Sequence, residues 1–133
     1  MSTVQAPRNP ESDPRVKAVF DDIRATRNTE FINQLWRYLA FDATLLEQTW
    51  AEVKRVMATP SALDPLTKEL VYITASVING CSYCVHSHTA AATAKGMTPQ
   101  QHAELLSIVA LASKTNQLAT ALQVPLDPEF DRG

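Results

Sequence analysis

The sequence contains little cysteine and little glycine, with two cysteines and three glycines among 133 residues. A small secreted domain held together by disulfides has more cysteines, spread along the chain. A hydrophobic content of 45% is enough to build a core without such cross-links. The two cysteines are therefore available for redox or metal chemistry, and the composition favours a cytoplasmic protein.

Runs of one charge and long apolar segments are also absent. The formal net charge is -2, and no cluster of Lys and Arg provides the basic footprint that binds nucleic acid or an anionic membrane. No segment approaches the roughly 18 uncharged apolar residues of a membrane-spanning helix, and the polar N-terminus lacks the apolar core of a signal peptide. We therefore expect no nucleic-acid partner and no membrane partner.

Signals for β-strands are missing as well. Alternating runs of Val, Ile and Thr do not occur, and Asn79-Gly80 separates helical patterns instead of strands. No glycine or proline interrupts the chain between Arg15 and Thr59. These features predict an all-α fold of one domain, residues 1–133, with extended tails at 1–13 and 125–133. They disfavour a thioredoxin fold, which needs βαβ units around its CxxC pair.

Apolar spacing and capping residues together predict about six helices. Asp64-Pro65 supplies the N-cap and first residue of the fourth helix, and Thr98 with Gln101 forms a capping box for the last. The expected helices are one containing Val16–Ile23, one containing Phe31–Leu39, one from Asp42 to about Met57, one from Pro65 to Ile78, one from about Cys81 to Lys95, and one from Thr98 through Leu122.

Residues suited to chemistry gather around the start of the fifth predicted helix: Glu69, Cys81, Cys84 and His88. At about 100° per residue, the two cysteines and the histidine fall within roughly 60° of one another on a helix, so they share one face. Cysteines three residues apart lie within disulfide range, and thiols in the first turn of a helix ionise more readily. The pair can alternate between dithiol and disulfide without refolding the helix.

Glu69 flanks the apolar stripe of its predicted helix, about 70° from the centre of the stripe. From this edge its carboxylate can reach the start of the next helix, where a raised pKa would suit it to proton transfer. The residues expected to form the stripe are Leu66, Leu70, Ile73 and Val77.

Residues 69–96 resemble the core motif of the alkylhydroperoxidase D type within the carboxymuconolactone decarboxylase family. That motif is a Glu, a CxxC pair twelve residues on, and a His four residues after the second Cys. The resemblance implies a thiol peroxidase in which Cys84 attacks the peroxide and Cys81 condenses with the resulting sulfenic acid. A dithiol donor, a lipoyl-bearing protein in characterised members, would then reduce the Cys81–Cys84 disulfide. Glu69 and His88 would form the proton relay, and no cofactor is implied.

Two side chains near the cysteines matter for this resemblance. Some members of the family have a relay histidine just before the second cysteine, where this chain has Tyr83. A phenol is not a base at neutral pH, so the departure predicts a shorter relay and a weaker peroxidase activity. His86 lies on another face of the predicted helix and is left out of the relay.

Other functions remain open at this point. A protein-disulfide reductase of the same fold would use the same dithiol, and a decarboxylase-like member of the family would need acid–base residues without the CxxC pair. A structural zinc module would combine both cysteines with His86 and His88. Its geometry is unfavourable, because His86 points away from the other three and zinc sites draw ligands from separated segments. A c-type haem is excluded by Val85, which stands where the attachment motif has His.

Apolar side chains spread widely around the second predicted helix. They cover roughly 160°, more than the ~100° of a single packed face, so part of this surface is expected to meet another subunit. The resemblance implies a homo-oligomer, either a trimer or a hexamer. Trp36 and Trp50 are expected in the core or at this interface. The apolar positions of the helix are Phe31, Ile32, Leu35, Trp36, Tyr38 and Leu39.

Overall fold

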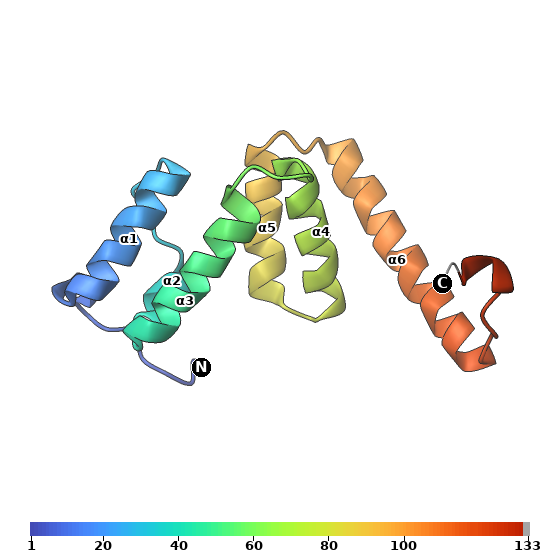
Figure 1. Ribbon diagram of the computed structural model, residues 1–133, viewed down its shortest axis with the longest axis horizontal. Coiled ribbons are helices and arrows are strands. Elements are labelled where there is room, and N and C mark those ends of the chain that lie inside the picture. The colour runs from blue at the N-terminus through green and yellow to red at the C-terminus, as the bar shows by residue number, and fades with distance from the viewer. Residues whose placement is uncertain (132–133) are drawn as a thin grey trace. The chain divides into compact units, whose positions relative to one another are not determined.

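The computed structural model describes residues 1–131, and over that range it contains helices and no strands (Figure 1). The predicted all-α fold with about six helices is confirmed. Within the described range no helix combines the length and the apolar character that crossing a membrane requires. The α-helices are α1 Pro14–Arg27, α2 Gln34–Leu39, α3 Ala43–Val53, α4 Pro65–Ile78, α5 Ser82–Ala94 and α6 Pro99–Leu122.

The chain divides into two compact units at residue 61, with α1 to α3 in the first and α4 to α6 in the second. Two tryptophans form the centre of the first unit. Trp36 and Trp50 are buried and meet edge to face with ring centroids 5.5 Å apart, which confirms them as core residues. Nε1–H of Trp50 donates to Asp22 at 2.7 Å, so the polar atom of this indole has a partner. The other members of this core are Val16, Val19, Phe20, Ile23, Ile32, Ala40 and Leu46.

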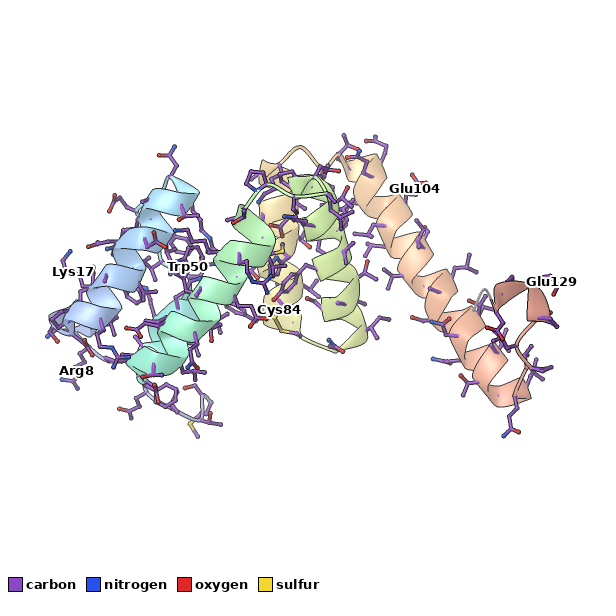
Figure 2. The ribbon with its side chains drawn as sticks, in the orientation of Figure 1. Arg8, Lys17, Trp50, Cys84, Glu104 and Glu129 are labelled. Atoms are coloured by element: carbon purple, nitrogen blue, oxygen red, sulfur yellow. A yellow bond between two sulfur atoms is a disulfide. The ribbon has the colours of Figure 1, made fainter. Side chains whose placement is uncertain are left out.

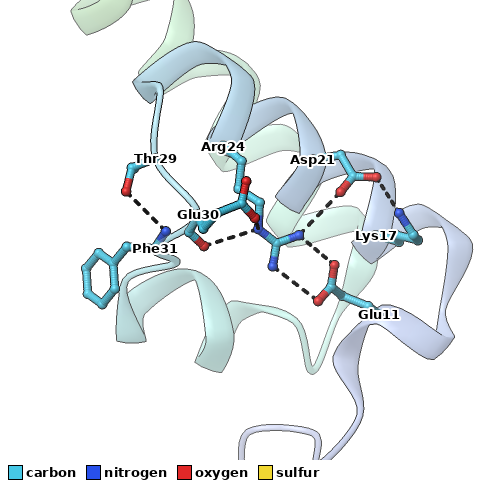
Figure 3. Close-up of polar contacts among 7 residues, drawn as sticks. All are labelled: Glu11, Lys17, Asp21, Arg24, Thr29, Glu30 and Phe31. Carbon is cyan, nitrogen blue, oxygen red and sulfur yellow. Dashed lines mark hydrogen bonds and ion pairs between the residues drawn. The ribbon is translucent and has the colours of Figure 1, made fainter.

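Ion pairs connect the end of α1 to the N-terminal segment in the same unit (Figure 3). The guanidinium of Arg24 lies 2.7 Å from a carboxylate oxygen of Glu11, and its Nε donates to the backbone oxygen of Glu30 at 3.2 Å. The hydrogen bond from Arg24 lowers the pKa of Glu11 below its ordinary value. Asp21 also contacts Arg24 and pairs with Lys17. The contact with Glu30 joins α1 to the turn that leads out of it, and the contact with Glu11 joins α1 to the N-terminal segment.

Helices α4 and α5 form a hairpin in the second unit (Figure 1). Asp64 caps α4 by accepting a hydrogen bond from the backbone N–H of Thr67 at 3.0 Å. The turn between the helices is short because Gly80 adopts a φ of 70°, a left-handed conformation that is unfavourable for residues with a Cβ. This turn delivers the chain directly to Cys81, so the fold places the cysteines beside the end of α4.

The start of α6 has the capping box that the sequence predicts. The Thr98 hydroxyl accepts from the backbone N–H of Gln101 at 3.0 Å, and the Gln101 side chain accepts from the backbone N–H of Thr98 at 2.9 Å. Much of α6 is exposed, with Val109 as its buried residue. The small apolar core of this unit consists of Ile73, Ala92 and Met97, with Leu66, Leu70 and Leu105 packed against it.

Helix α2 is shorter than the sequence predicts. It begins at Gln34, so Phe31 and Ile32 precede it instead of lying within it. The reason is the end of α1, where Asn28 adopts a left-handed φ of 51° and the chain reverses before the next helix begins. Ile32 is nevertheless buried, so its apolar character reflects core packing from an irregular segment.

The third predicted helix and the two tails also differ in detail. Helix α3 continues after Val53 as a π-helical turn over Lys54–Ala58, so the helical pattern extends to about the predicted end. The tails expected to be extended contain 3-10 turns at Pro10–Ser12 and Pro128–Phe130. Residues 132–133 of the second tail lie outside the described part. The structure contains two compact units, and the assignment of the whole chain to one domain stays a prediction.

Candidate active site

The two cysteines lie where α5 begins and are joined by a disulfide. Cys81 is the N-cap of α5, and Cys84 lies in its first turn (Figure 2). Their Cα atoms are 5.3 Å apart. The backbone N–H of Cys84 donates to Sγ of Cys81 at 3.2 Å. Because N–H groups at a helix start stabilise a thiolate, this position favours an ionised sulfur once the disulfide is reduced.

Glu69 and His88 meet across the α4–α5 hairpin. Oε2 of Glu69 lies 2.7 Å from Nδ1 of His88, which is a hydrogen-bond distance. His88 follows Cys84 by four residues, so the imidazole stands one helical turn along the same face of α5. The structure thus brings the predicted acid–base pair together and places it one turn from the disulfide.

Lys95 is a second partner of Glu69. Its Nζ donates to Oε1 of Glu69 at 3.1 Å from the C-cap position of α5. The side chain of Glu69 is 7% exposed, whereas that of Lys95 is 39% exposed. Glu69 is therefore a buried carboxylate with a hydrogen-bond partner on each oxygen, as burial of a charge requires.

Burial and hydrogen bonding act in opposite directions on Glu69. Burial raises the pKa of Glu69, but the hydrogen bonds from His88 and Lys95 and the charge of Lys95 lower it by more, so the pKa lies below its ordinary value. The expected raised pKa is wrong, because these hydrogen bonds and the charge of Lys95 outweigh the effect of burial. At neutral pH Glu69 is an anion that accepts Nδ1–H of His88, which leaves Nε2 as the nitrogen free to exchange a proton.

The buried face of α4 is also displaced from the predicted stripe. Glu69, Ile73 and Ser76 are its buried residues, while Val77, which was expected in the stripe, is 37% exposed. Glu69 thus lies on the face that packs against α5, and not at its edge. The helical pattern alone does not distinguish buried from exposed apolar residues, and short apolar side chains such as Val77 also occur on exposed faces.

The sequence did not indicate Tyr72 and Lys95 as members of this site. The ring of Tyr72 stacks on that of His88, with centroids 3.7 Å apart and planes inclined by 21°. Tyr72 lies three residues after Glu69, and this spacing puts both on one side of α4. The spacing is the sequence feature that could have indicated Tyr72 as a member of the site. Lys95 marked only the approximate end of its predicted helix, and no spacing linked it to Glu69.

Two side chains close to Cys84 in the sequence, Tyr83 and His86, lie at the surface. Tyr83 is 42% exposed, and His86 is exposed. Over residues 1–131 no three His, Cys, Asp or Glu side chains are grouped as ligands of a metal ion.

Together these residues define a class of protein: an all-α protein with a disulfide-forming CxxC pair at a helix start, beside a buried glutamate–histidine pair. The sequence profile of the carboxymuconolactone decarboxylase family matches residues 44–127, and the chain belongs to that family. It is similar to the crystal structure of the alkylhydroperoxidase AhpD core from Rhodospirillum rubrum, with 57% sequence identity and a TM-score of 0.94, over 98% of this chain and 97% of that one. The comparison with curated proteins gives no match. The fold is therefore AhpD-like.

Proposed function

We propose that this protein is a thiol peroxidase that reduces peroxides through a dithiol–disulfide cycle of Cys81 and Cys84. The observation that carries the proposal is the disulfide one helical turn from His88, whose Nδ1 is held by the buried carboxylate of Glu69. A dithiol beside an acid–base pair has the two components that peroxide reduction needs, a nucleophilic sulfur and a proton donor for the leaving oxygen. The name of the similar Rhodospirillum rubrum protein supports the same chemistry.

In the first step the reduced Cys84 attacks a peroxide. Its thiol proton passes to His88, and the thiolate sulfur forms a bond to the terminal oxygen of the hydroperoxide. The O–O bond breaks, and the departing alkoxide takes the proton back from His88 and leaves as an alcohol. Cys84 is then a sulfenic acid, oxidised by two electrons, and the peroxide is reduced by two. The anion of Glu69 holds the imidazole in place during both transfers.

In the second step Cys81 resolves the sulfenic acid. Sγ of Cys81 attacks Sγ of Cys84, the S–O bond breaks, and the hydroxyl leaves as water with the proton of Cys81. The product is the disulfide present in the structure. A dithiol donor reduces it by thiol–disulfide exchange and becomes a disulfide itself. A lipoyl group is a donor of this kind, and the family resemblance makes a lipoyl-bearing protein our proposed partner.

Cysteine and glutamate variants test the assignment of these roles. Cys84→Ser is expected to abolish consumption of cumene hydroperoxide by the reduced protein, whereas Cys81→Ser should react once and stop as a sulfenic acid that a dimedone probe captures. Glu69→Gln should slow the reaction by about 100-fold and keep the helical circular-dichroism spectrum. Glu104→Gln, on the exposed surface of α6, is the matched control. Full activity of Cys84→Ser contradicts the assignment.

A protein-disulfide reductase is the second candidate, because the same disulfide lies at a helix start and both cysteines are only partly buried. The two functions are separated by their oxidants. A reductase loses its two thiols to a disulfide-bonded protein such as insulin and not to one equivalent of cumene hydroperoxide. The decarboxylation in the family's name is supported less well, because acid–base chemistry of that kind leaves the CxxC pair without a role.

Self-association is part of the proposal. On α6 four apolar side chains are 50% to 72% exposed, at positions 108, 111, 118 and 122. This spacing corresponds to the seam of a coiled coil, with Thr115 at the position between the two pairs. A seam of this kind fits another helix, and we propose that the α6 helix of a second copy occupies it within a trimer or hexamer. The residues of the seam are Ile108, Leu111, Thr115, Leu118 and Leu122.

A further inference from the structure

The stacking of Tyr72 on His88 is a contact that the CxxC motif does not include. Tyr72 and Glu69 are three residues apart on α4 and approach the same imidazole, Glu69 at Nδ1 and Tyr72 at the face of the ring. We propose that Tyr72 is a positioning residue that fixes the plane of the His88 ring for proton exchange with the reduced cysteines. This inference rests on the proposed function and adds a positioning residue beside its relay.

A single hydrogen bond does not determine the orientation of an imidazole. The 2.7 Å contact to Glu69 fixes the position of Nδ1, but the ring can still turn about the direction of that bond. The phenol ring of Tyr72 removes this freedom. Its centroid lies 3.7 Å from that of the imidazole and the two planes are inclined by only 21°, so turning the imidazole would drive its edge into the phenol ring. Because Glu69 holds Nδ1 and Tyr72 covers one face of the ring, Nε2 points in a defined direction.

The direction of Nε2 matters because this nitrogen exchanges the proton. General acid–base catalysis depends on a short, aligned path between donor and acceptor, and small displacements of a reacting group lower rates strongly. Nδ1 is engaged with Glu69, so a ring that rotates freely would spend much of its time with Nε2 turned away from Cys84. Tyr72 is thus expected to act on the rate through His88, without touching the peroxide.

The exposure of Tyr72 separates this role from core packing. Tyr72 is 38% exposed, whereas Ile73, the next residue of α4, is fully buried. The stability of the unit therefore depends on Ile73 far more than on Tyr72. The contact is made by the ring and not by the hydroxyl, so phenylalanine should preserve it while an aliphatic side chain should not.

Two variants of the full-length protein test the proposal, Tyr72→Leu and the matched control Tyr72→Phe. Two rates are measured on each reduced protein: oxidation of its thiols by cumene hydroperoxide and alkylation of its thiols by iodoacetamide. The leucine variant is expected to be about tenfold slower in both, and the phenylalanine variant to stay within about twofold of the parent. Ring-current shifts of the His88 carbon-bound protons, seen by NMR, report the stack directly and should be lost in the leucine variant alone.

The outcomes separate this inference from the proposed function. If the parent protein does not react with the peroxide, the proposed function fails, while the alkylation rates still decide the role of Tyr72. Parent-like alkylation of Tyr72→Leu together with lost ring-current shifts overturns the inference. A phenylalanine variant as slow as the leucine variant also overturns it, because the hydroxyl and not the stack would then matter. Should the leucine variant fail to fold, Tyr72→Gln repeats the test with a side chain suited to a half-exposed helical position.

Discussion

At the residue scale the central feature is the carboxylate of Glu69 between two cationic or protonatable partners. A buried carboxylate without partners would have a raised pKa and would tend to be neutral. Here His88 and Lys95 reverse that effect and keep the pKa of Glu69 below its ordinary value. As an anion, Glu69 is therefore suited to orient the imidazole, and in the proposed mechanism the proton exchange is assigned to His88.

The Lys95 contact gives a prediction about pH. Lys95→Met removes a hydrogen bond and a positive charge from Glu69, so the pKa of Glu69 should rise. In the parent protein the lowered pKa contributes stability that is fully present above the ordinary value of 4.5 and is lost as the pH falls through the folded-state pKa. The variant has less of this contribution. It should therefore be less stable than the parent at pH 7, by about 0.5 kcal/mol because Lys95 is partly solvated, and the difference should shrink toward pH 3.

Urea unfolding followed at several pH values checks this expectation. Lys95→Arg, which keeps the charge, is the control and should follow the parent curve. The acid limb of peroxide consumption should move in the same sense, to higher pH in Lys95→Met, since more of Glu69 is then protonated at a given pH. A stability difference that stays constant from pH 7 to pH 3 contradicts the assigned pKa direction.

Much of the site was predictable from residue identities and spacing. Cys84 and His88 share α5, and Cys81 is its N-cap, so their arrangement follows from helical periodicity and from where the helix begins. The contact of Glu69 with His88 joins two helices. The sequence indicated only that Glu69 could reach the next helix from the edge of the apolar stripe, and the pairing with His88 came from the family resemblance. The Tyr72 stack and the Lys95 contact depend on how α4 and α5 pack, which a single helical wheel does not contain.

At the element scale the α4–α5 hairpin carries the whole candidate site. Its turn sets which residues of α4 face which residues of α5, so the register between Glu69 and His88 depends on the conformation of Gly80. Helix ends with strong caps were predicted well, as at Asp64 and Thr98, because capping is local chemistry. The start of α2 was predicted incorrectly. Apolar residues such as Ile32 show the same sequence pattern whether they lie in a helix or in the segment before it.

Gly80 gives a prediction at this scale. Gly80→Ala should destabilise the protein by about 1 kcal/mol, since alanine at a φ of 70° is strained. A Cβ at this position would meet nothing within 4 Å, so the effect comes from the backbone and not from a clash. Gly80→Asn, which tolerates the left-handed region better, should lose less. Urea unfolding of the three proteins measures the order, and an alanine variant as stable as the parent contradicts it.

At the scale of the whole molecule, the structure contains two compact units with small apolar cores. The first exposes apolar side chains around α2, with Phe31 at 65% and Leu35 at 43%, and the second exposes the seam of α6. Exposed apolar surface of this extent is typical of proteins that associate. The sequence indicated such a surface on the second helix but not on α6, because a seam is recognised only once the opposite face is known to be buried.

The α6 seam predicts a concentration-dependent assembly. Light scattering coupled to size-exclusion chromatography should give a trimer or a hexamer for the parent protein. Leu118→Glu, which places a charge in the seam, should lower the mass, whereas Gln117→Glu places the same charge on another face of α6 and should not. A parent protein that elutes as a monomer at about 100 μM contradicts the proposed assembly, since stable interfaces hold at far lower concentrations.

The measurement that tests the account most directly is mass spectrometry of the reduced protein before and after one equivalent of cumene hydroperoxide, with a thiol label and a native-mass measurement for bound metal. We expect two labelled thiols before the peroxide and none after it, with a new bond between Cys81 and Cys84 and no mass for a metal ion. Two thiols that remain fully labelled, or a stoichiometric zinc ion, would contradict the peroxidase proposal.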